Sequence, residues 1–333
     1  MSEKIAVLVN LRAGRASEAV ASACRRRLPD ARVMTSRSLE EALGFARTFG
    51  AEPPGLFVSA GGDGTAVALI NALRGQPAAS ATIGCLRLGT GNGWARATGA
   101  PKWRRAIEQL SALPAGVLPS QRFDLVEVDG TLAHFAGTGW DAEIIDDFHA
   151  QKTGLGVLPR KWRHGLAGYL QGLTTRTIPR YALARRTLPE VELINTGEDA
   201  IGIDDDGRPV PLPHAKHGAV LYRGPASVCA AGTAPQWGFE FRAFPFAGLV
   251  PRRFCMRVYA GNAIEATLHS PALWRGQHPL KNMHTWMLTR ARAVFSRSVP
   301  FQIGGDRAGW RSEVEYTLAE EQVDLLDWRR LQA

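Results

Sequence analysis

Three glycines and one carboxylate share a single turn in this chain, Gly61-Gly62-Asp63-Gly64-Thr65. The turn follows an apolar run at 55–60 and precedes apolar residues at helical spacing over 65–74. Glycines leave backbone N–H groups accessible, and the N-terminus of the following helix attracts anions. These features predict a phosphate site. Because Asp63 would repel phosphate, we expect Mg²⁺ or a hydroxyl proton between them, as in phosphoryl transfer from a metal-bound nucleotide.

A second turn of this kind reads Gly89-Thr90-Gly91-Asn92-Gly93 and follows an apolar run at 82–88. It does not have the dinucleotide pattern GxGxxG, because Trp94 stands where the third glycine would be. The P-loop pattern GxxxxGK[ST] does not occur in the sequence. We therefore expect a phosphate site that belongs neither to a dinucleotide-dependent dehydrogenase nor to a P-loop enzyme.

Strands and helices must alternate in the first third of the chain to position these turns. The predicted strands are 4–10, 31–35, 55–60 and 82–88, and the predicted helices are 17–28, 39–49, 65–74 and 93–98. This rhythm is typical of a parallel sheet with helices on its faces. Ligands of such sheets bind beyond the carboxyl ends of the strands. Both glycine turns follow predicted strands, so we expect them side by side at one edge of the sheet.

From about residue 123 the pattern changes to short predicted strands separated by Gly, Pro and Asp, as far as about 318. The first two, 123–128 and 131–136, form a predicted hairpin. The preceding segment, 111–122, has two prolines and a glycine and is typical of a linker. The predicted fold class is α/β, with a parallel-sheet nucleotide-binding domain followed by a β-rich antiparallel substrate domain. The predicted domains are 1–122, completed by 318–333, and 123–317.

The composition is that of a globular protein with a basic surface. Of 333 residues, 45% are hydrophobic and 21% are charged, with a net charge of +9. A basic surface favours nucleotide phosphates or acidic lipid headgroups. The sequence has no nucleic-acid-binding motif spacing, so we expect no nucleic-acid partner. No apolar run reaches the roughly 18 residues needed to cross a bilayer, and four scattered cysteines predict reduced core thiols of a cytoplasmic protein.

The two glycine turns, in this order, resemble the diacylglycerol kinase catalytic-domain family, which includes bacterial lipid kinases, sphingosine kinases and ceramide kinases. The resemblance extends to an Asn-x-x-x-Gly turn at 10–14, FAGTGWDAEI at 135–144, FRAFPFAG at 241–248 and FQIGGD at 301–306. It implies an ATP-dependent lipid kinase. The implied substrate is diacylglycerol, or a sphingolipid such as ceramide or a sphingoid base.

The resemblance also implies which residues bind the nucleotide. They are Asn10, Arg12, Gly14, Thr35, Gly62, Gly64, Thr65 and Thr90. The reading of the two turns as phosphate sites adds Gly61, Gly89, Gly91 and Asn92, and the basic segment at 159–173, which could reach towards nucleotide phosphates, adds Arg163. The implied cofactors are ATP and Mg²⁺, with Asp63 close to the metal-bound phosphates. A solvated Arg12 and a strand-end hydroxyl at Thr35 stay open as alternatives.

A lipid hydroxyl is a poor nucleophile and needs a base within hydrogen-bond reach. The resemblance offers two acids for this role, Asp63 and Asp306, and leaves open which of them acts. The family's Asp-Gly-Glu motif here reads Gly-Gly-Asp and ends at Asp306. The resemblance also implies a lipid-headgroup acid among Asp141, Glu143 and Asp146, although acids are equally typical of a solvated helix start.

We expect a cytoplasmic protein that meets its lipid substrate by peripheral contact with an anionic membrane, because the net charge is +9. A basic segment with interleaved apolar residues, 159–173, is typical of a helix at a membrane surface, and a core-packing helix is the alternative. A homodimer stays open. The alternative functions are an NAD kinase-like or polyol kinase, or a nucleotide-binding regulatory protein whose altered Gly-Gly-Asp motif no longer catalyses.

Overall fold

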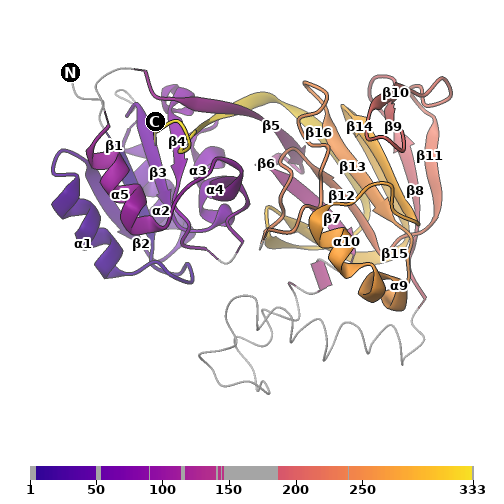
Figure 1. Ribbon diagram of the computed structural model, residues 1–333, viewed down its shortest axis with the longest axis horizontal. Coiled ribbons are helices and arrows are strands. Elements are labelled where there is room, and N and C mark those ends of the chain that lie inside the picture. Colours follow the sequence, from indigo (N-terminus) through magenta and orange to yellow (C-terminus); the bar gives the residue numbers. More distant parts are fainter. Residues whose placement is uncertain are drawn as a thin grey trace, which may run out of the picture. The chain divides into compact units, whose positions relative to one another are not determined.

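The computed structural model describes residues 5–49, 54–89, 91–113, 117–139, 142–143, 145, 187–238 and 240–331. The chain divides into two compact units (Figure 1). The first comprises residues 1–123 and 321–333, and the second comprises residues 124–320. Strands β5 (Ser120–Val128) and β16 (Asp306–Leu326) carry the chain from one unit into the other.

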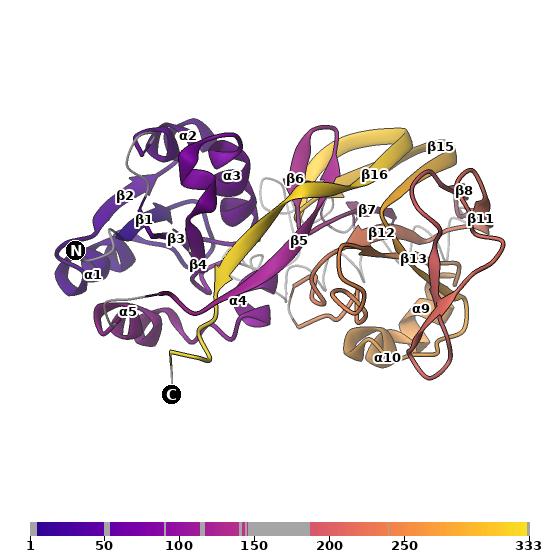
Figure 2. The same cartoon turned by 90° about the horizontal axis from the view of Figure 1, so that it is seen from above.

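The first unit is a parallel sheet with helices on both faces, as predicted. Its strands are β1 (Ile5–Asn10), β2 (Arg32–Ser36), β3 (Leu56–Ala60) and β4 (Thr82–Cys85), in the order β4-β3-β1-β2, and the end of β16 pairs with β4. Its helices are α1 (Glu18–Arg27), α2 (Leu39–Arg47), α3 (Asp63–Leu73), α4 (Gly93–Ala97) and α5 (Trp103–Ser111), with a 3₁₀ helix at Pro77–Ser80. Figure 2 shows α2 and α3 on one face of the sheet and α1 and α5 on the other.

The central strands of this sheet are apolar on both faces because helices cover both. All residues of β3 are buried, and so are Ala6 to Val9 of β1. Such continuous apolar runs are typical of parallel strands. Strand β4 is shorter than the predicted 82–88, because the chain turns after Cys85. There the Leu88 amide donates to the carbonyl oxygens of Leu86 and Gly61, which brings the chain back towards the first glycine turn.

The second unit is a largely antiparallel β-structure. Besides β5 and β16, its strands are β6 (Thr131–Ala133), β7 (Phe135–Gly139), β8 (Glu190–Asn195), β9 (Ile201–Ile203), β10 (Pro209–Pro211), β11 (Val220–Pro225), β12 (Val228–Gly232), β13 (Phe254–Tyr259), β14 (Met283–Leu288) and β15 (Arg290–Ile303). Their order is β10-β9-β14-β13-β12-β7-β15-β16, and β8 pairs with β15 and β11. Phe254, Met256, Leu288 and Tyr316 are completely buried in its core.

Two features of the second unit differ from the predicted short strands. Strands β15 and β16 are long, with 14 and 21 residues. Two helices, α9 (Ala263–Leu268) and α10 (Ser270–Arg275), connect β13 to β14. The sequence carried a local sign of α9, because asparagine at 262 followed by glutamate at 265 is a pair typical of a helix start. Among the described residues, no helix combines the length and the apolarity needed to cross a membrane.

The C-terminal segment completes the first unit. Leu325 of β16 pairs in parallel with Ile83 of β4. Beyond the strand, the Trp328 side chain is completely buried, and its backbone amide donates to the carbonyl oxygen of Thr98 at 3.1 Å. The first unit therefore needs residues from both ends of the chain.

We expect Trp328→Ala to lower the free energy of unfolding by about 3–5 kcal/mol, because the change removes a large buried side chain and leaves a cavity. Urea unfolding followed by circular dichroism measures this difference. Trp310→Ala is the matched control, since the Trp310 side chain is 53% exposed and should change stability by at most about 0.5 kcal/mol. Equal effects of the two substitutions would contradict this account of the C-terminal segment.

Candidate functional site

The two glycine turns lie against each other at the carboxyl ends of β3 and β4, as predicted. A Cβ atom on Gly89 would lie 2.2 Å from Cα of Gly62, and a Cβ atom on Gly62 would lie 3.1 Å from Cα of Gly89. The Leu88 amide also donates to the carbonyl oxygen of Gly61 at 3.3 Å. The two backbones approach this closely because neither residue has a side chain.

The carboxylate of Asp63 joins the two turns. Asp63 is the first residue of α3. Its Oδ2 accepts a hydrogen bond from the Gly93 amide at 2.9 Å, and its Oδ1 accepts one from the Trp94 amide at 3.2 Å. These amides begin α4 and have no partner within that helix. Asp63 thus provides hydrogen-bond acceptors for the amides at the start of α4, which begins 30 residues further along the chain.

Burial raises the pKa of the Asp63 carboxyl above its ordinary value, although hydrogen bonds from the amides of Gly93, Trp94 and Asn92 partly oppose this effect. The residue as a whole is half-buried, and its carboxylate is enclosed by the two turns. Burial, and next the charge of Asp63, raise the pKa of the Cys85 thiol, so Cys85 stays protonated. The Asp63 carboxylate is therefore more basic than a solvated aspartate.

Asn92 fixes the second glycine turn. Its backbone is left-handed, with a φ of 61°, a conformation that asparagine adopts more readily than most residues. The side chain is buried and binds Gly89 twice. Oδ1 accepts from the Gly89 amide at 2.9 Å, and Nδ2 donates to the Gly89 carbonyl oxygen at 2.7 Å.

Asn10, at the end of β1, connects the first strand to the same place. Its Nδ2 donates to Oγ1 of Thr65 at 2.9 Å, and its Oδ1 accepts from the Arg12 amide at 3.0 Å. The loop after β1 also reaches the second turn, because the Arg15 amide donates to the carbonyl oxygen of Leu88 at 2.9 Å. The structure thus brings Asn10, Thr65, Asp63 and the glycine turns together.

For the other residues predicted to bind the nucleotide, the structure gives positions near the turns or on neighbouring elements. Arg12 and Gly14 are exposed in the loop after β1, and Thr35 is partly buried on β2 beside Val9. Gly64 lies in the first turn of α3, and Gly91 directly precedes Asn92. Four predicted residues lie outside the described part of the chain: Thr90, Arg163, Asp141 and Asp146.

Asp306 is the first residue of β16 and belongs to the second unit. It is exposed and pairs with Ile303 across a two-residue turn, Gly304-Gly305. Both glycines have positive φ, 59° and 91°, as a tight hairpin requires. The Gly305 amide donates to Oε1 of Gln302 at 2.9 Å, which holds the turn. The Gly-Gly sequence of this motif therefore serves the hairpin, and it presents Asp306 at the surface.

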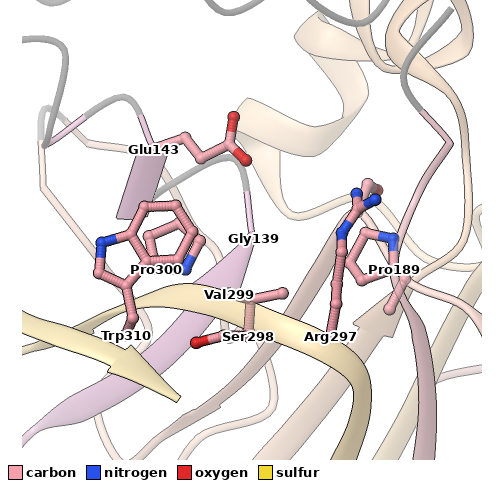
Figure 3. Close-up of a pocket in the computed structure, with 10 residues that line it drawn as sticks. Gly139, Glu143, Pro189, Arg297, Ser298, Val299, Pro300 and Trp310 are labelled. Carbon is pink, nitrogen blue, oxygen red and sulfur yellow. The ribbon is translucent and has the colours of Figure 1, made fainter. Parts of the chain in front are cut away.

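Glu143 is buried, with 7% of the residue exposed, and lines a pocket in the second unit. The pocket is small: its cavity volume is about 10 Å³, which is about enough for one water molecule. Figure 3 shows Glu143 and Arg297 on opposite sides of the pocket, with Ser298 and Val299 on the strand between them and Trp310 beside Glu143.

The bend of β15 creates this pocket. The pairing of β15 with β16 shifts between Val294 and Val299, so the residues between them leave the ladder. Arg297 and Ser298 lie in this interval and line the pocket. Sequence reasoning missed these two residues, as well as the amides of Gly93 and Trp94. The run Ser-Arg-Ser-Val-Pro at 296–300 was the available signal, because it interrupts the apolar alternation of the strand.

Among the described residues, no group of three or more His, Cys, Asp or Glu side chains could hold a metal ion. In that part of the chain, a metal at the glycine turns would therefore need ligands from a bound molecule as well as from Asp63. Magnesium often binds in this way, through one or two carboxylates and the phosphates of a substrate.

Residues 4–126, which contain both glycine turns, match the family model described as the diacylglycerol kinase catalytic domain. Over these residues the chain is similar to the diacylglycerol kinase catalytic domain family. The resemblance expected from the glycine turns is thus confirmed, and kinases of this family use ATP. No curated protein shows a significant sequence match to the chain.

Solved structures from Bacillus anthracis str. Sterne resemble both units of the chain. The crystal structure of a diacylglycerol kinase is 14% identical with a TM-score of 0.63, covering 97% of this chain and 96% of that one. Two candidate diacylglycerol kinases of the same organism are 16% and 18% identical, each with a TM-score of 0.65 and 97% coverage of both chains. At these identities the likeness shows the fold, an α/β unit followed by a β-rich unit, as predicted.

Gly89→Ala should destabilise the first unit by about 1–3 kcal/mol, because the added methyl group would overlap the backbone of Gly62. Thermal and urea unfolding give the difference. Gly44→Ala is the control: a Cβ atom there meets nothing within 4 Å, and alanine within a helix stabilises by up to about 1 kcal/mol. Unchanged stability of Gly89→Ala would show that the turns are not packed as described.

Proposed function

We propose that this protein is an ATP-dependent lipid kinase that transfers the γ-phosphate of ATP to a lipid hydroxyl. The observation that carries the proposal is the pair of glycine turns joined by Asp63 within a diacylglycerol kinase catalytic domain. The proposed acceptor is diacylglycerol or a sphingolipid such as ceramide or a sphingoid base. Because such lipids reside in membranes, the enzyme would act at a membrane surface, from the cytoplasm.

The start of α3 fits a nucleotide phosphate. The helix has 11 residues, and its first intrahelical bond runs from the Thr65 amide to the Gly62 carbonyl oxygen at 3.0 Å. The amides of Asp63 and Gly64 precede that bond and point out of the helix end. A helix N-terminus next to glycines that let a ligand approach the backbone is a favourable phosphate site.

Asp63 would contact Mg²⁺ bound to those phosphates. The amides of Gly93, Trp94 and Asn92 already bond to this carboxylate, so the ion would bind at a lone pair that these amides leave. The ion would neutralise part of the charge on the transferred phosphoryl group. The amides at the start of α4 hold the carboxylate in one orientation, so it needs no rearrangement when the nucleotide binds.

In the proposed reaction the lipid hydroxyl gives its proton to a carboxylate, its oxygen bonds to the γ-phosphorus, and ADP leaves. Asp63 and Asp306 are the two proposed proton acceptors. The raised pKa of Asp63 favours proton uptake, whereas the exposed position of Asp306 favours access to a lipid.

We also propose that Glu143 recognises the lipid headgroup. Its carboxylate is buried in a pocket that also contains Arg297 and the partly exposed ring of Trp310 (Figure 3). A buried carboxylate can accept hydrogen bonds from a hydroxyl or an amine. A single hydroxyl or amine of a headgroup would reach this carboxylate from the mouth of the pocket, and the rest of the lipid would have to lie outside it.

Consumption of ATP by the purified protein, measured with single lipids in detergent micelles, tests the proposed function. Diacylglycerol, ceramide and sphingosine are the informative acceptors, with NAD and glycerol as the acceptors of the alternative kinases. ATP binding without turnover of any acceptor would instead favour a nucleotide-binding regulatory protein.

Asp63→Asn should lower turnover at least ~100-fold, since it removes a charge aimed at the phosphates or a positioned base. If Asp306 is the base, Asp306→Asn should lose turnover with little change in ATP affinity, and Asp306→Glu should retain measurable activity. Steady-state kinetics and ATP titration of each variant provide these values. Asp205→Asn, at an exposed hairpin turn, is the control and should match the wild type.

Full activity of Asp63→Asn would refute the proposed mechanism. Full activity of Asp306→Asn would leave Asp63 as the base. Because asparagine would direct an amide group at the Gly93 or Trp94 amide, the melting temperature of Asp63→Asn must be measured as well, so that a folding defect is separated from a catalytic one.

A further inference from the structure

Helix α9 exposes two large apolar side chains. Ile264 is 65% exposed and Leu268 is 73% exposed. Residues four apart in a helix lie on the same side of it, one turn apart. These two side chains therefore form one apolar surface on a helix of six residues.

The remaining contacts of α9 explain why this surface faces outward. Ala266 packs with Leu273 of α10 against the buried ring of Tyr259. Glu265 is held at the start of the helix by a capping box: its Oε2 accepts from the Asn262 amide at 3.0 Å, and its own amide donates to Oδ1 of Asn262 at 2.9 Å. The one charged side chain of α9 is thus occupied with the backbone, while its largest apolar side chains face solvent. Ordinary surface helices have the opposite arrangement.

This apolar surface lies at the same end of the sheet as the Glu143 pocket. Tyr259 ends β13, immediately before α9, and pairs with Val228 of β12. Val228 also pairs with Gly139, which lines the pocket. Ser227, another pocket residue, donates its amide to the Tyr259 carbonyl oxygen at 2.8 Å. Figure 1 shows α9 and α10 together at this end of β13 and β14.

The surroundings of α9 are basic. Arg242, Arg275 and Lys281 are exposed, and the Arg242 amide donates to the carbonyl oxygen of Trp274 in α10. Two acids lie nearby: Glu265, whose side chain caps α9 and lies 4.0 Å from Nζ of Lys281, and the exposed Glu240, two residues before Arg242. The three cations outnumber them. Apolar side chains surrounded by cations match the boundary of an anionic bilayer, where the chains enter the acyl region and the cations meet lipid headgroups.

We propose that α9 docks the protein on an anionic lipid surface, with Ile264 and Leu268 inserted and Arg242, Arg275 and Lys281 among the headgroups. We call these five residues the docking surface. The proposal deepens the proposed function and rests on it, because docking here would place the Glu143 pocket next to the bilayer that supplies the lipid. Binding to a bilayer is measured without ATP or turnover, so the two proposals can fail separately.

Vesicle co-sedimentation of the full-length protein tests the docking surface. With vesicles of phosphatidylcholine and phosphatidylglycerol in equal parts, the variant Ile264→Ser/Leu268→Ser should bind at least ~10-fold more weakly than the wild type. The matched control is Leu39→Ser/Val220→Ser, which also removes two exposed apolar side chains, 61% and 46% exposed, and should bind as the wild type does. Melting temperatures verify that both variants are folded.

A site-specific label tests insertion directly. The four native cysteines are buried and form no disulfide, as predicted, so a cysteine placed by Ile264→Cys is the reactive one. An environment-sensitive dye at this position should shift to the blue on anionic vesicles, whereas the same dye at Leu39→Cys should not.

Three outcomes would overturn the proposal: no binding of the wild type to anionic vesicles, unchanged binding of the α9 variant, or no spectral shift at position 264. A change of oligomeric state in the α9 variant with unchanged vesicle binding would assign the surface to a contact between copies of this chain. Arg275→Gln/Lys281→Gln should weaken binding to anionic vesicles and reduce its dependence on salt.

Discussion

The close contact between Gly62 and Gly89 is the constraint on which the first unit depends. Two strand-to-helix turns can touch through their backbones only where neither has a side chain. This contact brings the start of α3 to the start of α4, and the Asp63 carboxylate then reaches the amides of Gly93 and Trp94. Asn10 and Asn92 are oriented towards the same place by their hydrogen bonds.

Asp63 consequently has a structural role at the start of α4 and, in the proposed mechanism, a chemical role beside the phosphates. Its hydrogen bonds satisfy backbone groups that would otherwise lack partners at the start of α4. The same enclosure raises its pKa and gives it a fixed orientation beside the proposed phosphate site. A carboxylate held in this way is preorganised, which is the property that electrostatic catalysis requires. Under the proposed mechanism, a substitution at this position would therefore alter both stability and chemistry.

The second unit obtains its local features from interruptions of regular β-structure. The register shift in β15 displaces Arg297 and Ser298 into the pocket of Glu143. The connection from β13 to β14 forms α9 and α10 at the same end of the sheet, and the capping box of Glu265 leaves Ile264 and Leu268 outside. The pocket and the docking surface thus share one end of this sheet.

The sequence by itself determined the α/β class of the first unit, the adjacency of its two glycine turns and the resemblance to the kinase family, because apolar periodicity and glycine clusters are local signals. It also predicted Asp63 and Asp306 as the candidate acids of the reaction. Only the tertiary structure decided what Asp63 binds. Its partners are the backbone amides of Gly93 and Trp94, and almost every residue has such an amide, so the sequence does not distinguish them. The bend of β15 and the outward face of α9 were likewise decided there. A strand's register and a helix's buried side depend on the neighbours that pack against them, and those neighbours are distant in the chain.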